Sequence, residues 1–531
     1  MVLSPKRLWE NYDRSLLPLE VSEISRKATE NGTERRVYFN GEATALGCTR
    51  IFARLIASAQ KTDKLIVVLP EPEQDVCAAD FSFLSDNGWD ILIADYAGNA
   101  FGHARFTIYP SALSFADFDA LSLYKPAQNP QRSCWYEWAT VALRAVTFAQ
   151  SEGYTRVALC GFGLGGANVL KAAAVTTYPV CALSFFSPGF FPETEDPELL
   201  GTNISMDVRG YAPLLKIPFL QLCCSNDTDA SLDDISEFTE QAAQSSQKAM
   251  LYIAPRIHKS LTKEMTANAV TFLSAYLNDE TAPSLHAFAP DITFTASGAD
   301  KKMYFSLQCA QKLRDATFYV SHGIKNPAYR NWRTIPTEKA GELEYIGYTD
   351  VFSADRPVYA FCAVTTESGF TYCSPVLEKV PSAMHILPST ITKRRLIYES
   401  DMGLDDFFTT VDQDPPVIKE GPFGIEGICA KSGLCTYKLG DVAFGGAPDS
   451  VLQLLLFSSV PQNITFSVTD EDQFLTYTCT KTVSPDTDWT KIMLSASDFK
   501  SADGFFVGWH RAILLRIDAE AEFIISSLLW V

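Results

Sequence analysis

The sequence contains no long apolar run and no segment that would carry the chain into a membrane. No stretch approaches the roughly eighteen consecutive apolar residues that a membrane-spanning helix needs. Its first residues, MVLSPKRLWENYDRSLL, lack the apolar region and the small-residue cleavage site of a signal peptide. These absences predict a cytoplasmic protein with no membrane partner.

Positive charge and closely spaced cysteines are also scarce. Lys and Arg number 44 against 63 Asp and Glu, which gives a formal net charge of −19. Such a chain repels phosphate backbones, and no dense Lys/Arg cluster offsets this, so we expect no nucleic-acid partner. The thirteen cysteines include no CxxC motif, and many lie in apolar runs. We therefore expect reduced, buried thiols, no zinc site and no cofactor.

What the chain does contain predicts a large folded protein. Its 531 residues are 47% hydrophobic and 20% charged, and this length favours several domains. Over residues 1–280, strand-like runs such as KLIVVLP (64–70) and RVALC (156–160) alternate with helical patterns such as WYEWATVALRAVTFAQSEG (135–153). This alternation is typical of an α/β fold with a mostly parallel sheet flanked by helices.

The second half of the chain is rich in strands. Short strand-like runs separated by turns over residues 285–382 predict a β-sandwich of immunoglobulin or fibronectin type. Residues 394–531 are again strand-rich and predict a jelly-roll β-sandwich. We expect linkers at 278–291 and 381–395, and therefore three domains.

The segment LCGFGLGGANVL (159–170) has the sequence of a nucleophile elbow without its nucleophile. In α/β-hydrolases a strand enters G-x-S-x-G, turns sharply and continues as a helix. Here the central position is Gly163. Glycine accepts the positive φ of that position without steric cost, so the turn should persist while the chemistry is lost.

A nucleotide-binding turn is the alternative interpretation of these glycines. Gly161, Gly163 and Gly166 satisfy G-x-G-x-x-G. A dinucleotide site usually follows the first strand, however, and needs an acid about twenty residues further on. Several strands precede this turn, and residues 183–191 read LSFFSPGFF. The hydrolase elbow is the better explanation.

An acid and a histidine follow the elbow in the order that a hydrolase triad requires. Asp227 comes after the strand PFLQLCC, and His258 comes after the strand AMLYIA. The acid would orient the imidazole, which would accept the nucleophile's proton. Asp229 is the alternative acid, and a turn aspartate with a surface histidine is the purely structural interpretation.

Residues 34–278 resemble the dienelactone hydrolase and acetyl xylan esterase branch of the α/β-hydrolases. The likeness depends on RVYFNGEA, LIVVLP and DILIADYAGNAFG, on the Trp- and Ala-rich helix before the elbow, and on the order elbow, Asp, His. It implies cleavage of carboxylic esters, often on sugars, by a Ser or Cys nucleophile. This chain departs at Gly163. It also carries Glu71 and Glu73 where an oxyanion-binding turn is expected, and their charge would oppose an oxyanion.

Four further residues are candidates for ligand binding. Leu164 follows Gly163 in the elbow, Glu71 lies where the oxyanion-binding turn is expected, and Trp489 and Trp509 lie in the predicted jelly roll. The segment WTKIMLSASDF (489–499) resembles the penultimate strand of carbohydrate-binding jelly rolls, whose exposed aromatics bind sugars. Core packing is the alternative fate of these tryptophans. The acids Glu399, Asp401, Asp405 and Asp406 could hold calcium or form a solvated loop.

Three functions remain open from the sequence. The first is a hydrolase-like protein without its nucleophile that binds a small-molecule or carbohydrate ligand. The second is an active carboxylic-ester hydrolase that uses an unconventional nucleophile, or a water activated by His258 and Asp227. The third is a purely structural protein.

Overall fold

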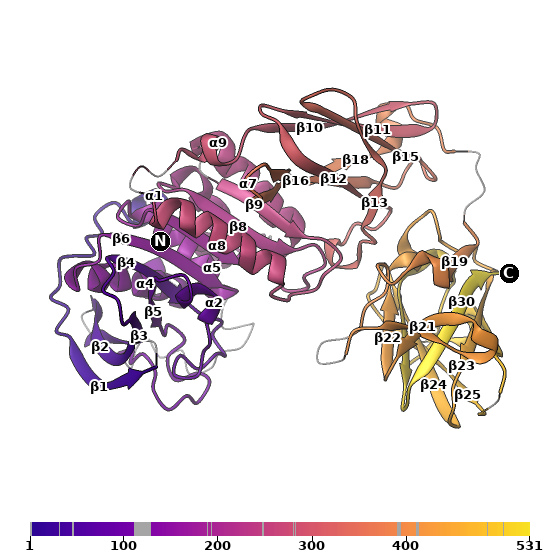
Figure 1. The fold of residues 1–531 in the computed structure, drawn as a ribbon, viewed down its shortest axis with the longest axis horizontal. Helices are drawn as coiled ribbons and strands as arrows, with labels where there is room; N and C mark the ends of the chain where they lie inside the picture. The colour runs from indigo at the N-terminus through magenta and orange to yellow at the C-terminus, as the bar shows by residue number, and fades with distance from the viewer. Residues whose placement is uncertain are drawn as a thin grey trace. The chain divides into compact units, whose positions relative to one another are not determined.

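The computed structural model describes residues 3–30, 32–44, 47–110, 129–187, 189–192, 194–246, 249–279, 281, 283–389, 394–409, 414–485, 487–502 and 504–531. The chain forms two compact units (Figure 1). Unit 1 comprises Met1–Asp291, Cys309–Asp315 and Ala363–Pro375. Unit 2 comprises Ile292–Gln308, Ala316–Cys362 and Val376–Val531, and so includes most of both predicted β domains.

A mixed sheet forms the centre of unit 1. Its strand order is β1-β2-β3-β5-β4-β6-β7-β8-β9-β17. From β5 to β9 neighbouring strands are parallel, whereas β1 to β3 and β17 pair antiparallel at the two sides. The strands are β1 (Ser22–Thr29), β2 (Gly32–Thr44), β3 (Gly47–Ser58), β4 (Lys64–Leu69), β5 (Asp90–Ala94), β6 (Arg156–Phe162), β7 (Cys181–Phe185), β8 (Phe219–Cys224), β9 (Ala249–Ala254) and β17 (Thr371–Cys373).

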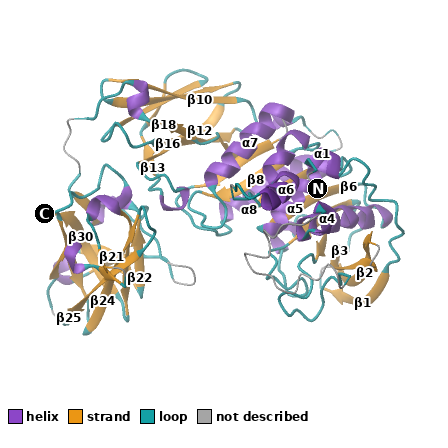
Figure 2. Ribbon diagram, turned by 180° about the vertical axis from the view of Figure 1, so that it is seen from behind, coloured by secondary structure: helices purple, strands orange, loops and turns teal. Residues whose placement is uncertain are grey.

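Helices cover this sheet because its central strands are apolar on both faces. Every residue of β5, β7, β8 and β9 is buried, as expected for strands covered on two sides. In Figure 2, α4, α5 and α7 lie against the sheet. Helix α2 packs on α8. The helices are α1 (Pro5–Leu8), α2 (Ser82–Ser85), α4 (Cys134–Ser151), α5 (Leu164–Val175), α6 (Pro197–Met206), α7 (Leu232–Ser246), α8 (Lys263–Leu277) and α9 (Leu285–Phe288).

Unit 2 is built from strands. A four-stranded sheet has the order β10-β11-β15-β14, and two six-stranded sheets are formed by β19, β20, β21, β23, β26 and β30 and by β22, β24, β25 and β27 to β29. The strands before residue 390 are β10 (Ile292–Ala299), β11 (Lys302–Cys309), β12 (Leu313–His322), β13 (Arg333–Ile335), β14 (Thr337–Lys339), β15 (Glu344–Asp350), β16 (Val358–Thr366) and β18 (Leu377–Lys379).

The strands after residue 393 enclose one apolar core. Side chains of both six-stranded sheets meet there, and Trp509 is completely buried in it. These strands are β19 (Leu396–Glu399), β20 (Val417–Glu420), β21 (Glu426–Ala430), β22 (Gly433–Thr436), β23 (Val451–Phe457), β24 (Gln462–Asp470), β25 (Thr476–Val483), β26 (Thr490–Ser495), β27 (Lys500–Ser501), β28 (Gly504–Phe505), β29 (Ala512–Ala519) and β30 (Phe523–Trp530).

Buried polar contacts join segments of unit 2 that are far apart in the sequence. The carboxylate of Asp441 is buried and accepts a hydrogen bond from Asn331 Nδ2 at 3.3 Å. Arg333 Nε lies 3.3 Å from the same carboxylate. Arg356 pairs with Glu471 at 2.7 Å. The division of this unit into two domains at residues 382–394 stays a prediction.

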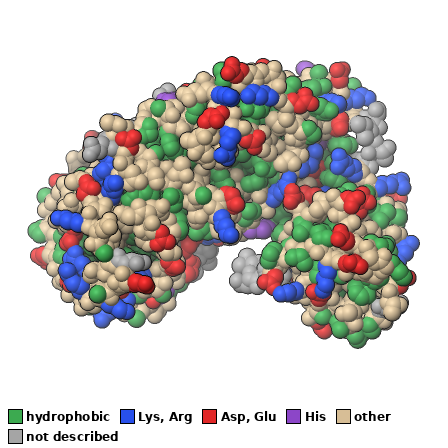
Figure 3. Space-filling view, in the orientation of Figure 1, with side chains coloured by type: hydrophobic (Ala, Val, Ile, Leu, Met, Phe, Trp, Pro, Cys, Tyr) green, Lys and Arg blue, Asp and Glu red, His purple; other side chains and the backbone are tan. Residues whose placement is uncertain are grey.

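The cysteines are mostly buried, and charged side chains of both signs lie on the surface. All thirteen cysteines are free thiols, and eleven of them are buried. Acidic and basic side chains are interspersed over the face shown in Figure 3. Among the described residues, the helices are too short or too polar to cross a bilayer.

One charged group of unit 1 is buried without an ion-pair partner. Lys171, on α5, has no exposed surface, and its Nζ has no hydrogen-bond partner. The ammonium lies 4.1 Å from the centre of the Trp135 ring. Burial lowers the pKa of Lys171 to about 7, because the apolar surroundings disfavour the charged form.

Replacing Lys171 with Met should therefore raise the free energy of unfolding at pH 7 by about 2 kcal/mol. The unfolded chain keeps a lysine pKa near 10.5, so the folded protein gains stability as the pH rises from about 7 towards 10.5. The Met variant should lack this gain. Urea titrations at pH 7 and pH 9.5 measure it, with the exposed Lys27→Met as control. Equal pH dependence in both variants would contradict the buried charge.

Candidate functional site

The carboxyl ends of four parallel strands bring the predicted site residues to one edge of the unit 1 sheet. Glu71 follows β4, Gly163 follows β6, Asp227 follows β8 and His258 follows β9. These strands lie in the order β4-β6-β7-β8-β9. Ligands of open α/β sheets bind outside the carboxyl ends of the strands, so this edge is the candidate site.

Gly163 has the backbone conformation of a nucleophile elbow. Its φ is 52° and its ψ is −121°, and α5 begins at the next residue. Its N–H donates to the Phe185 carbonyl at 2.8 Å, which fixes the turn on β7. A Cβ on Gly161 would lie 2.4 Å from the Gly165 carbonyl oxygen, so strand and helix approach as closely as glycine permits.

The carboxylate of Glu71 fills the space where a nucleophile's side chain would lie. A Cβ built on Gly163 would be 1.8 Å from Glu71 Oε2 and 2.3 Å from Oε1. Real Cβ atoms never approach an oxygen this closely, so no side chain at position 163 is compatible with the observed position of Glu71. A carboxylate here would also repel the phosphates of a dinucleotide, which counts against the nucleotide-binding alternative.

Lys259 holds this carboxylate in place. Its Nζ lies 3.0 Å from Glu71 Oε1 and 3.2 Å from Asp229 Oδ2. Burial raises the pKa of Glu71, and the ammonium of Lys259 limits that rise. Burial lowers the pKa of Lys259, but the carboxylates of Glu71 and Asp229 outweigh it and the pKa is raised. The two groups therefore favour each other's charged form.

Asp227 and His258 lie on adjacent loops that are hydrogen bonded to each other. The N–H of Asn226 donates to the Ile257 carbonyl at 3.1 Å. Asp227 Oδ1 accepts the N–H of Asp229 at 2.8 Å, whereas its buried Oδ2 has no hydrogen-bond partner. Asp229 is occupied by Lys259, so Asp227 is the acid with an oxygen free to accept from an imidazole.

The imidazole of His258 is half-buried. Burial lowers its pKa, and a hydrogen bond with the backbone of Asn226 opposes this. A neutral imidazole is the form that a general base requires. The roles assigned to Asp227 and His258 from the sequence stay predictions.

Other nucleophilic side chains near the elbow are not exposed. Cys160 is completely buried in β6, and burial raises the pKa of its thiol. The Ser225 hydroxyl is also buried; it donates to Asn226 Oδ1 and accepts the N–H of Arg256, both at 2.7 Å. Ser187 is buried as well. None of these three side chains presents an open reactive atom.

The remaining predicted residues differ in their exposure, and binding by Leu164 and Trp489 stays a prediction. Leu164 is half-buried against the unit 1 core. Trp509 is fully buried against Trp530, with ring centres 5.1 Å apart, which leaves its indole no exposed surface for a ligand. Trp489 is half-buried and donates to the Pro422 carbonyl at 3.2 Å. Asp406 pairs with buried Lys438 at 2.7 Å, so one acid of the predicted calcium group is neutralised.

Lys259 is the residue that the sequence analysis missed. It stands directly after His258, so its presence near the site could be read from the sequence. Lys259 pairs with Glu71, which stands 188 positions earlier in the chain. The order of the strands in the sheet brings the two residues together. Within the described part of the chain, no three His, Cys, Asp or Glu side chains lie where they could share a metal ion.

Several solved esterases are similar to about half of the chain. An acetyl xylan esterase from a Paenibacillus species is 16% identical over 50% of this chain and 91% of its own, with a TM-score of 0.39. Acetyl xylan esterase 1 from a Thermoanaerobacterium species is 14% identical over 51% and 94%, with a TM-score of 0.40. A cold-adapted esterase from an Arctic intertidal metagenomic library is 17% identical over 48% and 98%, with a TM-score of 0.35. No protein-family model and no curated protein sequence matches the chain.

A methyl group on Gly163 should be costly because it meets Glu71. We expect Gly163→Ala to lower the free energy of unfolding by about 3 kcal/mol. In a Glu71→Ala background the same change should cost at least about 1 kcal/mol less, because the carboxylate no longer blocks the Cβ. Urea unfolding of the four proteins in a double-mutant cycle measures the coupling.

Gly102→Ala is the matched control for this cycle. Gly102 also has a positive φ, 68°, but a Cβ there would have no atom within 4 Å. Its substitution reports the backbone cost alone, and it should show no coupling to Glu71→Ala. A Gly163→Ala cost equal to the Gly102→Ala cost would mean that Glu71 moves aside freely.

Proposed function

We propose that unit 1 is an α/β-hydrolase-like domain that has lost serine-type ester hydrolysis and binds a sugar or an ester-like small molecule. The observation that carries this proposal is the Glu71 carboxylate at the position of the missing side chain of residue 163, 1.8 Å from its Cβ site. The chain therefore lacks the nucleophile and also fills its place.

The strand order and the elbow support the hydrolase-like part of the proposal. Parallel strands β4 to β9 present the elbow, Asp227 and His258 along one edge, in the order that such hydrolases use. The backbone of Gly163 keeps the positive φ of that turn. The resemblance to carbohydrate-ester hydrolases in the sequence suggests the ligand class.

The charge at the elbow supports the loss of activity. Acyl transfer needs donors that stabilise a developing oxyanion. Glu71 instead places a negatively charged carboxylate at this point, which would repel an oxyanion. Lys259 neutralises this charge by pairing with Glu71. Unit 2 would then serve as an accessory part of the protein. Within it, residues 394–531 would bind carbohydrate.

A second candidate function is favoured by the same carboxylate. Glu71 Oε2 lies at the elbow, 1.8 Å from the Cβ site of residue 163, so it could itself attack the acyl carbon of an ester. The alkoxide of the ester would leave and take a proton from water, and a mixed anhydride would form on Glu71. A second water, deprotonated by His258, would hydrolyse the anhydride, and His258 would return that proton to the solvent. This reaction restores the carboxylate and releases the acid.

Hydrolysis of short aryl esters tests both candidates. We expect no turnover by the unmodified protein and little by Gly163→Ser, because the new side chain meets Glu71. Gly163→Ser combined with Glu71→Ala should be more active than Gly163→Ser alone by about tenfold or more, and His258→Ala should remove that gain.

Turnover by the unmodified protein would overturn the proposal of lost activity. The carboxylate mechanism then requires that Glu71→Gln abolish turnover; label from ¹⁸O-labelled water in the Glu71 carboxyl group would show that water attacks the anhydride at that carbon. Turnover that survives Glu71→Gln but depends on His258 would indicate an activated water instead.

A further inference from the structure

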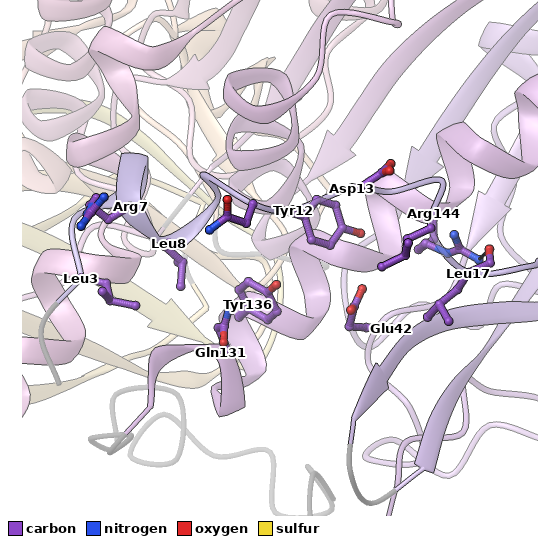
Figure 4. A pocket seen from close by; sticks show the side chains of 12 residues that line it. Leu3, Arg7, Leu8, Tyr12, Asp13, Leu17, Glu42, Gln131, Tyr136 and Arg144 are labelled. Atoms are coloured by element: carbon purple, nitrogen blue, oxygen red, sulfur yellow. Dashed lines mark hydrogen bonds between the residues drawn. The ribbon is translucent and has the colours of Figure 1, made fainter.

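A hollow in unit 1 serves to anchor the N-terminal segment. Residues before β1, the first turn of α4 and the end of β2 surround it (Figure 4). Arg144 of α4 donates Nε to the Asn40 carbonyl at 2.9 Å and Nη2 to the Leu17 carbonyl at 3.0 Å. The charged group of this hollow is therefore taken up by backbone carbonyls of the chain itself.

A groove in unit 2 is different, because it is lined by side chains that are open to solvent. It lies on the outer face of the four-stranded sheet β10-β11-β15-β14. In Figure 1, β10, β11 and β15 lie together in one part of the ribbon. The groove has a volume of about 450 Å³, which is in the range of small-molecule sites. Its lining residues belong neither to the elbow nor to residues 394–531.

The two faces of this sheet differ because successive side chains of a strand point to opposite sides. On the inner face, Phe305 of β11 is buried and stacks on Phe294 of β10 with ring centres 5.7 Å apart. Phe294 also meets Phe318 of β12 at 5.0 Å. This packed inner face gives the outer side chains a rigid support, since strands hold a site more precisely than loops do.

Two tyrosines form the apolar part of the groove. Tyr304 of β11 and Tyr348 of β15 are opposite each other in the strand register, and their ring centres lie 5.8 Å apart. Tyr304 is 36% exposed and Tyr348 is 47% exposed. Exposed apolar side chains that are gathered in a groove and rimmed by polar groups are typical of a ligand site.

Polar side chains occupy the neighbouring positions on the same face. In the next row across the sheet, Ile346 of β15 is paired with Ser306 of β11 on one side and with Glu338 of β14 on the other. Glu344 stands two residues before Ile346 and therefore on the same face. Ser306, Glu338 and Glu344 all line the groove, and so does Ser297 of β10. The two rings thus lie beside hydroxyl groups and two carboxylates.

The charges of this face decide which class of ligand it suits. Glu338 and Glu344 would repel an anion. An apolar protein surface would strip water from both carboxylates without replacing their hydrogen bonds. The Nζ of Lys302 lies 4.0 Å from the centre of the Tyr348 ring, so this ring already has a cation beside it. A neutral ligand rich in hydroxyl groups meets none of these obstacles.

We propose that this groove binds a neutral oligosaccharide whose pyranose rings carry equatorial hydroxyls. Such a ring has apolar C–H faces, which pack on Tyr304 and Tyr348. The hydroxyls at its rim donate to the carboxylates of Glu338 and Glu344, because hydrogen bonds to a charged acceptor are the stronger ones. The Ser306 hydroxyl both donates and accepts. This site is separate from the function proposed for the elbow and does not rest on it.

Calorimetric titration of the full chain with cellotetraose tests the proposal. We expect saturable binding at sugar concentrations up to about 10 mM. Tyr304→Ala and Tyr348→Ala each remove one ring and should weaken binding at the groove at least about tenfold. The matched control is Leu387→Ala, which shortens an exposed apolar side chain outside the groove and should bind as the unmodified protein does.

The number of bound sugars separates this groove from any other sugar site in the chain. Tyr304→Ala combined with Tyr348→Ala should remove one bound cellotetraose per chain and leave the far-ultraviolet circular dichroism unchanged, because both side chains are exposed. Unchanged binding by this double variant would place the sugar elsewhere and overturn the proposal. Absence of binding by the unmodified protein would also overturn it. Glu71→Ala should leave this binding intact, so the outcome at the elbow is measured separately.

A charged sugar of the same shape tests the role of the carboxylates. The β-1,4-linked tetramer of glucuronate should bind at least about tenfold more weakly than cellotetraose, because Glu338 and Glu344 repel it. Replacing both acids with Gln should reduce this difference. Equal binding of the two sugars by the unmodified protein would show that the carboxylates do not face the ligand, and would overturn the proposed arrangement.

Discussion

The space beside Gly163 is the constraint on which the rest of the candidate site depends. Two groups compete for it: a side chain on residue 163 and the carboxylate of Glu71. Glycine has no side chain to occupy this space, and it adopts the positive φ of residue 163 without strain. The Glu71 carboxylate needs a counter-charge, which Lys259 provides. Lys259 also pairs with Asp229. Glu71, Lys259 and Asp229 thus form one connected set of charges beside Gly163.

Buried charge is a recurring feature of unit 1. Glu71 is half-buried and paired, Lys171 is buried and unpaired, and Glu137 is buried beside Glu42. A pair held at an ordinary distance costs less than a lone charge, because each group replaces part of the water that the other has lost. The lone groups are destabilising unless they bind something or change protonation state.

The local features of the elbow were readable from the sequence. RVALC followed by glycines and an Ala-rich segment predicts strand, tight turn and helix, and the structure has β6, a turn at Gly163 and α5 there. The central parallel strands were predictable as well, because they are apolar on both faces. Trp509 shows the limit: exposed and buried tryptophans have the same sequence pattern, and only the packing against Trp530 decided its place.

The sequence by itself determined that residue 163 has no side chain and that an acid and a histidine follow in order. These features can be read from the sequence because the hydrophobic pattern and the glycine spacing that predict a strand, a turn and a helix are local, spanning only a few residues. Only the tertiary structure decided that the Glu71 carboxylate lies beside Gly163 and that Lys259 pairs with it. Those contacts join residues far apart in the chain, and sheet order and strand register bring them together.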